Sequence, residues 1–138
     1  MKAMKIGLPL AAVGAMFLLS WARAAEVGRQ AGNVVRMAGM SFQPRAITVT
    51  AGDTVTWRND SGVVQTVTDD PALATHPSNA ALPDGAGPIS SGDIAPGDTF
   101  QYTFTVPGVY RYFSMPQETK GMVASVLVRP APKAATGN

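Results

Sequence analysis

Hydrophobic and polar residues alternate along most of the chain from Val34 to Val128, in short runs that are typical of β-strands. About seven such runs follow one another, and none shows a helical period. They cover Val34 to Met37, Ile47 to Thr50, Thr54 to Asn59, Val63 to Thr68, Thr99 to Thr105, Val109 to Phe113 and Met122 to Val128. Turn-forming groups such as Ala51-Gly52-Asp53 separate them. The pattern therefore predicts an all-β fold, a two-sheet sandwich of about seven to eight strands.

The alternation also predicts which side chains face the core of this sandwich. Val55 and Trp57 share one face of their strand while Arg58 lies on the other, because successive side chains of a strand point to opposite sides. The same parity places three polar or soft side chains inward at strand ends, and these are Gln65, Ser114 and Met122. These strand ends are candidate functional positions.

The strands lie within residues 34–129, which we expect to form one domain. Residues 25–33 are polar and contain glycine, and residues 130–138 are rich in Pro, Ala and Gly, so both are expected to be loose tails. Within the domain, the segment from Asp69 to Asp93 breaks the alternation, since it is rich in Pro, Gly, Ser and Asn. We expect it to be an excursion over one edge of the sandwich.

Residues 1–24 have the pattern of a secretory signal peptide. Lys2 and Lys5 give a basic start, an apolar run extends from Ile6 to Leu19, and Ala22-Arg23-Ala24 is a small-x-small cleavage site. The alternative is an uncleaved membrane anchor, but the apolar run is shorter than the roughly 20 residues that a spanning helix needs. We therefore expect a periplasmic or secreted protein that has no membrane association after cleavage.

The charge balance changes once the signal is removed. The whole chain has 11 Lys and Arg residues against 9 Asp and Glu residues, and three of the basic residues lie in the signal, so the mature protein is close to neutral. No Lys/Arg cluster remains, and this argues against a nucleic-acid partner. The chain has no cysteine, so its stability must come from a packed core and not from disulfides.

Four segments carry a resemblance to a known family. They are Phe42 to Asn59, Val63 to Thr68, Pro107 to Phe113, and the loop Ser114-Met115-Pro116-Gln117-Glu118-Thr119-Lys120-Gly121-Met122. Together they resemble the plastocyanin-like branch of the cupredoxins, the small blue-copper proteins, from about Val34 to Val128. The resemblance implies a Greek-key β-sandwich, copper as cofactor and electron transfer as the family's role.

The resemblance also implies where the copper ligands would lie. In the family the loop carries Cys, two residues, His, four residues and Met, and the first His occupies the slot of Gln65. Here Ser114 stands in the Cys slot and Gln117 in the second His slot, and only Met122 keeps a ligand side chain. Serine is a hard, neutral donor where blue copper needs a soft thiolate. We therefore expect weak copper binding or none, and loss of electron transfer with the metal.

The three replacements are consistent in shape, because Gln resembles His in reach and Ser is nearly isosteric with Cys. Since a half-satisfied buried polar pocket is costly, we hypothesise that the Gln65 and Gln117 amides meet at the Ser114 hydroxyl as a hydrogen-bonded plug. Decay of a duplicated copy and deliberate engineering would both produce such a set.

Two alternatives to a family member without copper remain. A copper(I) site built from thioethers would use methionines, namely Met37, Met40, Met115 and Met122. An interaction module would use the rim around Met115, Pro116 and Met122 as an exposed apolar patch that docks a periplasmic redox protein. In either case we expect a monomer.

Other chemistry has few candidates. His76 is the only histidine and sits in a polar loop, where a solvated surface role is expected. Asp69-Asp70 is far short of a calcium cage, and a solvated turn is expected there. No nucleophile has a base at a recognisable spacing and no glycine-rich loop precedes a helix, so we expect no enzyme activity.

Overall fold

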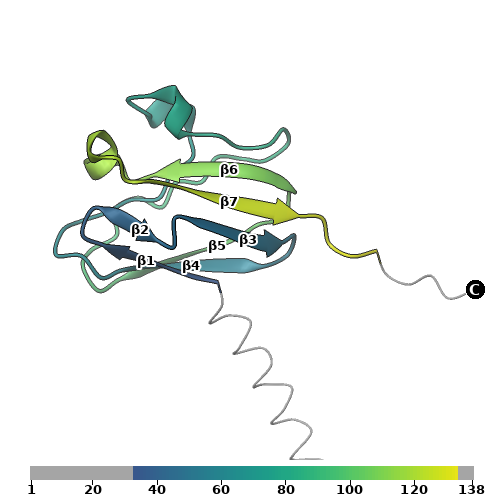
Figure 1. The fold of residues 1–138 in the computed structure, drawn as a ribbon, viewed down its shortest axis with the longest axis horizontal. Coiled ribbons are helices and arrows are strands. Elements are labelled where there is room, and N and C mark those ends of the chain that lie inside the picture. The colour runs from purple at the N-terminus through teal and green to yellow at the C-terminus, as the bar shows by residue number, and fades with distance from the viewer. Residues whose placement is uncertain (1–32, 134–138) are drawn as a thin grey trace, which may run out of the picture. The chain divides into compact units, whose positions relative to one another are not determined.

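The computed structural model describes residues 33–133, which contain seven β-strands in two sheets (Figure 1). One sheet has the order β2-β1-β4-β5, made of β2 (Ser41–Gln43), β1 (Val34–Ala38), β4 (Thr54–Asn59) and β5 (Thr99–Thr103). The other has the order β3-β7-β6, made of β3 (Ala46–Thr50), β7 (Val123–Arg129) and β6 (Gly108–Phe113). The all-β sandwich expected from the alternation is confirmed. The signal peptide and most of both tails lie outside the described residues.

Pairing across the sheets is mixed. Strands β1 and β4 pair in parallel, as do β3 and β7, whereas β1–β2, β4–β5 and β6–β7 are antiparallel. Consecutive strands β2 and β3 belong to different sheets. The helical content of the described residues is confined to short 3-10 turns, η1 (Pro71–Leu73), η2 (Pro77–Asn79) and η3 (Met115–Lys120). None of these is long or apolar enough to cross a membrane.

The core between the sheets is aromatic, and it follows the predicted parity. Val55 and Trp57 are fully buried while Arg58 is exposed. The Trp57 ring meets Tyr112 edge-on at 5.5 Å between centroids, and Tyr112 meets Phe42 at 4.7 Å. Burying each large apolar side chain contributes about 1.5–3 kcal/mol, so these rings supply much of the stability of a chain that has no disulfide.

The strand expected from Val63 to Thr68 does not form. Gln65 makes an isolated bridge to Ile94, and Thr68 makes isolated bridges to Ser90 and Phe113. Val63 is half exposed and lies in a bend, where its carbonyl group accepts a hydrogen bond from the Asn59 side chain and not from a neighbouring strand. The alternation was a correct guide to the burial of Gln65 and wrong about regular pairing. Conversely, the short strand β2 was not predicted.

The excursion from 69 to 93 runs along β6, the edge strand of its sheet (Figure 1). Ala81 and Arg111 exchange both backbone hydrogen bonds, at 3.1 and 2.9 Å. At the start of β6, Gly108 has φ +141° and a Cβ built there would lie 2.6 Å from the Pro83 Cβ, so only glycine allows this close approach. The predicted excursion over an edge is confirmed, and it protects that edge from pairing with other chains.

Candidate functional site

The candidate site begins with the loop that joins β6 to β7, from Ser114 to Met122. Three backbone hydrogen bonds close it: Ser114 N to Met122 O at 3.2 Å, Gln117 N to Ser114 O at 3.1 Å, and Met122 N to Gln117 O at 3.2 Å. Pro116 starts the η3 turn, and Gly121 ends it in the left-handed conformation at φ 86°. The loop therefore owes its shape to main-chain bonds and to its proline and glycine.

Three of the four predicted ligand positions are buried. Gln65, Ser114 and Met122 are each 0% exposed. Gln65 is held on the opposite side of the site by its bridge to Ile94, with backbone bonds of 3.1 and 2.8 Å. Gln117 is half-buried. Met122 therefore does not belong to an exposed rim, and that part of the expected docking patch is wrong.

The Ser114 hydroxyl occupies the centre of a buried network. It donates to Gln65 Oε1 at 2.7 Å and accepts from the backbone N–H of Thr66 at 3.1 Å. A second bond joins the same two segments, since the Thr66 hydroxyl accepts from the Met115 N–H at 2.8 Å. A serine in the thiolate slot thus ties the segment around Gln65 to the loop.

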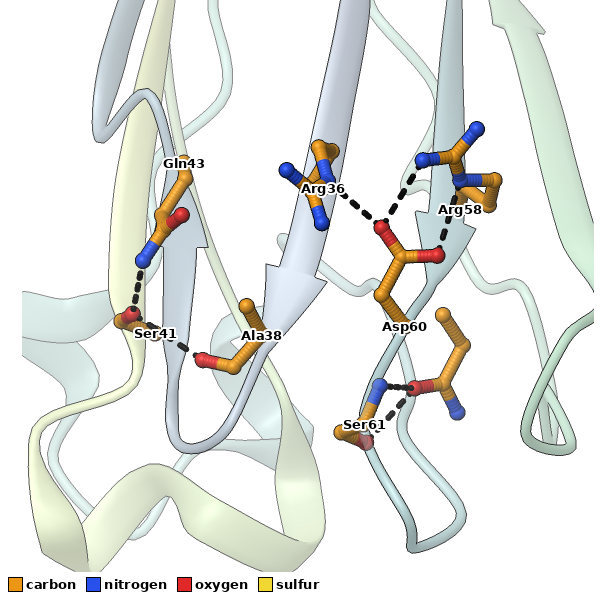
Figure 2. Close-up of polar contacts among 8 residues, drawn as sticks. Arg36, Ala38, Ser41, Gln43, Arg58, Asp60 and Ser61 are labelled. Carbon is orange, nitrogen blue, oxygen red and sulfur yellow. Dashed lines mark hydrogen bonds and ion pairs between the residues drawn. The ribbon is translucent and has the colours of Figure 1, made fainter.

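The amide nitrogen of Gln65 also has both of its hydrogens in hydrogen bonds. Gln65 Nε2 donates to the Gly39 carbonyl at 3.1 Å and to Ser61 Oγ at 3.2 Å. The hydroxyl and the N–H of Ser61 both donate to Asn59 Oδ1, at 2.6 and 2.9 Å, as the two dashed contacts of Ser61 in Figure 2 show. The Asn59 amide in turn donates to the carbonyls of Val63 and Ile94, both at 2.8 Å. Charge-free groups satisfy one another throughout this network.

Gln117 stands apart from this network. Its Oε1 is buried and has no hydrogen-bond partner. The expected bond between Gln65 and Ser114 is present, and the expected contribution of Gln117 to the plug is absent. The reason is its place within η3: its backbone N–H and carbonyl close the loop, which commits the residue to the turn while the Ser114 hydrogen is already given to Gln65.

These side chains do not fit a blue-copper ion. Blue copper needs one thiolate and two imidazoles around the metal, and the site offers two amides, one hydroxyl and one thioether. The Gln65 and Ser114 oxygens are also used by each other at 2.7 Å. Among residues 33–133 no group of three or more His, Cys, Asp or Glu side chains gathers elsewhere to replace the lost ligands.

Glu118, which the sequence analysis passed over, links the loop to the excursion. Its carboxylate is 4% exposed and accepts from the N–H groups of Thr75 at 2.8 Å and His76 at 2.9 Å and from Asn79 Nδ2 at 3.1 Å. Burial alone would raise the pKa of Glu118, but the hydrogen bonds from His76, Thr75 and Asn79 outweigh it and lower the pKa to about 2. We call this contact the Glu118 latch. No spacing in the sequence signals it.

One of the two adjacent aspartates, Asp69, differs from the expected solvated turn. Asp69 is 0% exposed, so the predicted solvated turn is wrong for it. Its Oδ1 accepts from the Ile89 N–H at 2.7 Å, while its Oδ2 is buried without a partner. Burial raises the pKa of Asp69 to about 6. Asp70 accepts from the Ala72 N–H at 2.9 Å and caps η1.

The remaining candidates are scattered. His76 is exposed, as expected of a solvated loop histidine. Of the methionines considered for a copper(I) site, Met37 and Met122 are fully buried whereas Met40 and Met115 are about half exposed.

Sequence comparison places the chain among copper proteins. Residues 30–129 match the family model of copper binding proteins of the plastocyanin/azurin family. Chloroplastic plastocyanin of Hordeum vulgare is 36% identical over 123 residues, which are 85% of this chain and 70% of that protein. Chloroplastic plastocyanin of Tetradesmus obliquus is 35% identical over 92 residues, 64% of this chain and 58% of that protein. The chain thus spans little more than half of the second relative.

Solved structures agree on the fold. An oxidized methionine-to-leucine mutant of amicyanin superposes with a TM-score of 0.57 at 23% identity, over 72% of this chain and 83% of that one. A Cu(I) form of a methionine-to-alanine mutant of amicyanin gives 0.54 at 26% identity, over 70% and 80%. The family is one of electron carriers and not of enzymes in the usual sense. The chain therefore belongs to the plastocyanin/azurin family of copper-binding proteins.

Proposed function

We propose that this chain is a metal-free member of its family, in which the copper position is closed by hydrogen bonds between side chains. The observation that carries the proposal is the 2.7 Å bond from Ser114 Oγ to Gln65 Oε1 between two fully buried residues. Copper could reach these oxygens only by breaking that bond and leaving Gln65 or the Thr66 N–H unsatisfied, which costs about 1–3 kcal/mol per buried group. An amide and a hydroxyl repay little of this as copper ligands.

The role that remains is docking, in the periplasm or another exported compartment. Several apolar side chains near the loop are about half exposed, and we name them the loop-end patch: Met40, Val63, Val64 and Met115. Their segments come together at one end of the sandwich, because Gln65 bonds Gly39, beside Met40, and because Met115 bonds Thr66. An apolar patch of this kind marks a partner surface. The proposed partner is an exported redox protein that this chain binds as a monomer, without exchanging electrons.

A copper titration of the purified protein tests the metal-free state. With Cu(II) we expect no blue absorption band, and calorimetry with Cu(II) and with Cu(I) should give no saturable heat. The matched control is the triple variant Gln65→His, Ser114→Cys, Gln117→His, which restores the family's ligand set on the same backbone and should turn blue.

Either of two results would overturn the proposal. A blue band in the unaltered chain would restore the electron carrier. Saturable Cu(I) heat that disappears in Met40→Leu, Met115→Leu would establish the thioether site instead. If the triple variant fails to fold, its circular dichroism will show this, and the titration of the unaltered chain still decides the question.

A further inference from the structure

The outer face of the β3-β7-β6 sheet contains a hollow of about 530 Å³. Strand parity explains what faces it: Tyr110, Ala124 and Val126 point into the core, so their neighbours in β6 and β7 point outward. Val109, Arg111, Val123 and Ser125 line the hollow from these two strands, and Arg45 lines it from the start of β3. This volume is within the range of about 300–1,000 Å³ that small-ligand sites occupy.

The hollow has a central position flanked by two cations. Ser125 lies opposite Arg111 in the β6–β7 register and opposite Ala46 in the β3–β7 register, and its N–H donates to the Arg45 carbonyl at 2.9 Å. The two arginines therefore approach Ser125 from strands on either side of β7. No acidic residue lines the hollow, although residues 33–133 carry slightly more acidic than basic side chains. The surface around the hollow is therefore positively charged, whereas residues 33–133 as a whole carry a slight negative charge.

The other sheet contains a pair of arginines that bind a carboxylate of the same chain. Arg36 on β1 and Arg58 on β4 are directly opposite each other in register, and both point at one carboxylate, that of Asp60 (Figure 2). Arg36 Nε lies 2.6 Å from Oδ2, and Arg58 binds with Nε at 2.8 Å from Oδ1 and Nη2 at 3.0 Å from Oδ2. Among the described residues, the guanidinium groups of Arg45 and Arg111 have no ion pair or side-chain hydrogen bond.

Apolar surface continues the hollow along the strands. Val109 is 53% exposed and lies directly opposite Leu127, which is 38% exposed. An occupant would therefore gain by combining a carboxylate over Ser125 with an aliphatic group over this valine–leucine pair. No aromatic side chain lines the hollow to stack a base, and this disfavours single-stranded nucleic acid.

The geometry points to a docking site for a short acidic segment of a partner protein, in which an Asp or Glu carboxylate lies between Arg45 and Arg111 and a neighbouring aliphatic side chain packs on Val109 and Leu127. Guanidinium groups bind carboxylates in a planar, two-pronged manner. This site lies on the β3-β7-β6 face, is built from residues outside the loop-end patch and does not depend on the metal-free role.

The test uses NMR titration of the full chain with an acetylated peptide Leu-Asp-Leu-Glu-Leu-amide. We expect chemical-shift changes concentrated at Val109, Arg111 and Ser125, and binding that weakens as salt rises. The matched peptide with Asn and Gln in place of Asp and Glu should bind roughly three- to tenfold more weakly, as should Arg111→Gln and Arg45→Gln. Arg36→Gln, which changes an exposed arginine on β1 of the other sheet and leaves Asp60 paired with Arg58, should bind like the unaltered chain.

Several outcomes would overturn the proposal. Equal binding of the neutral peptide would show that charge does not matter. Shifts confined to the loop-end patch would place the peptide elsewhere, and equal losses in Arg45→Gln, Arg111→Gln and Arg36→Gln would indicate diffuse attraction. Inorganic phosphate and vesicles of phosphatidylglycerol serve as further arms. Binding to either, lost in Arg111→Gln and without any peptide binding, would assign the hollow to phosphate groups.

Discussion

At the scale of single residues, one oxygen in place of one sulfur decides the chemistry of this molecule. Ser114 has nearly the shape of cysteine, and main-chain hydrogen bonds hold the loop that follows it. It cannot supply the thiolate on which blue copper depends. It instead gives its hydrogen to Gln65 at 2.7 Å and receives one from Thr66. The Ser114 hydroxyl therefore has a structural role in this buried network, and that role can be measured.

Ser114→Ala should lower the free energy of unfolding by about 1–3 kcal/mol, because it leaves the Gln65 carbonyl oxygen and the Thr66 N–H without partners in a buried place. Urea unfolding followed by Trp fluorescence would measure the change. Ser125→Ala, which alters an outward serine, is the control and should change the free energy by less than about 0.5 kcal/mol. Equal losses in the two variants would mean that the buried network contributes nothing particular.

Sequence reasoning was partly sufficient at this scale. The period-two alternation was enough to turn Gln65 and Ser114 inward, because parity depends only on local backbone geometry. It made no prediction for Gln117, which lies in a 3-10 turn where strand parity does not apply, and the expected place of this side chain in the plug rested on shape alone. The solvated turn expected for Asp69 was wrong, because the burial of this residue depends on the backbone of Ile89, twenty residues along the chain.

At the scale of elements, the long excursion is fastened at both ends of the β6 strand. Pro83 packs over Gly108 at its beginning, and the Glu118 latch lies beyond its end. The sequence predicted the excursion from its composition, but its fastening could not be foreseen because it rests on a carboxylate more than forty residues from the N–H groups it binds. The loop between β6 and β7 thus also positions η1 and η2.

Glu118→Gln should release this excursion locally. The neutral amide keeps the shape but loses the charge that strengthens the bonds to Thr75 and His76, so amide hydrogen exchange at these two residues should accelerate roughly tenfold or more, in keeping with bonds worth about 1.5–3 kcal/mol. Exchange in the strands β4 and β7 should change little. Asp84→Asn, which alters an exposed acid in the same excursion, is the control. Unchanged exchange at Thr75 and His76 would show that the latch is not needed.

At the scale of the whole molecule, two buried carboxyl groups make stability depend on pH in opposite directions. The pKa of Asp69 rises from 3.8 to about 6 on folding, so between these values the native state binds more protons than the unfolded state and stability falls as pH rises. The pKa of Glu118 falls from 4.5 to about 2, so the unfolded state binds more protons there and stability is lost as pH falls.

These two groups should therefore give greatest stability near pH 4 to 5. Urea unfolding between pH 2 and 8 would measure the curve. Asp69→Asn should flatten its decline from about pH 4 to 6, and Glu118→Gln should flatten its decline below about pH 4.5. A curve that keeps both slopes in the double variant would show that other carboxyl groups control the acid response.

The fold of the whole molecule was the most predictable level. Short alternating runs separated by turns leave few arrangements other than two packed sheets. Individual strand pairings were harder to predict from the sequence. The run around Gln65 forms only isolated bridges, and β2 has three residues. Long-range register is a property of packing, and one strand's pattern does not contain it.

Main-chain hydrogen bonds close the loop between Ser114 and Met122 on itself, so the conformation of its backbone does not depend on a metal ion. The loop conformation requires a proline near its beginning and a glycine in the left-handed conformation at its end. The side chains of Met115, Thr119 and Lys120 are exposed, so these positions can be changed without altering the loop. A short binding sequence introduced at those positions would be held in a fixed conformation, and the protein that carries it has no cysteine to oxidise.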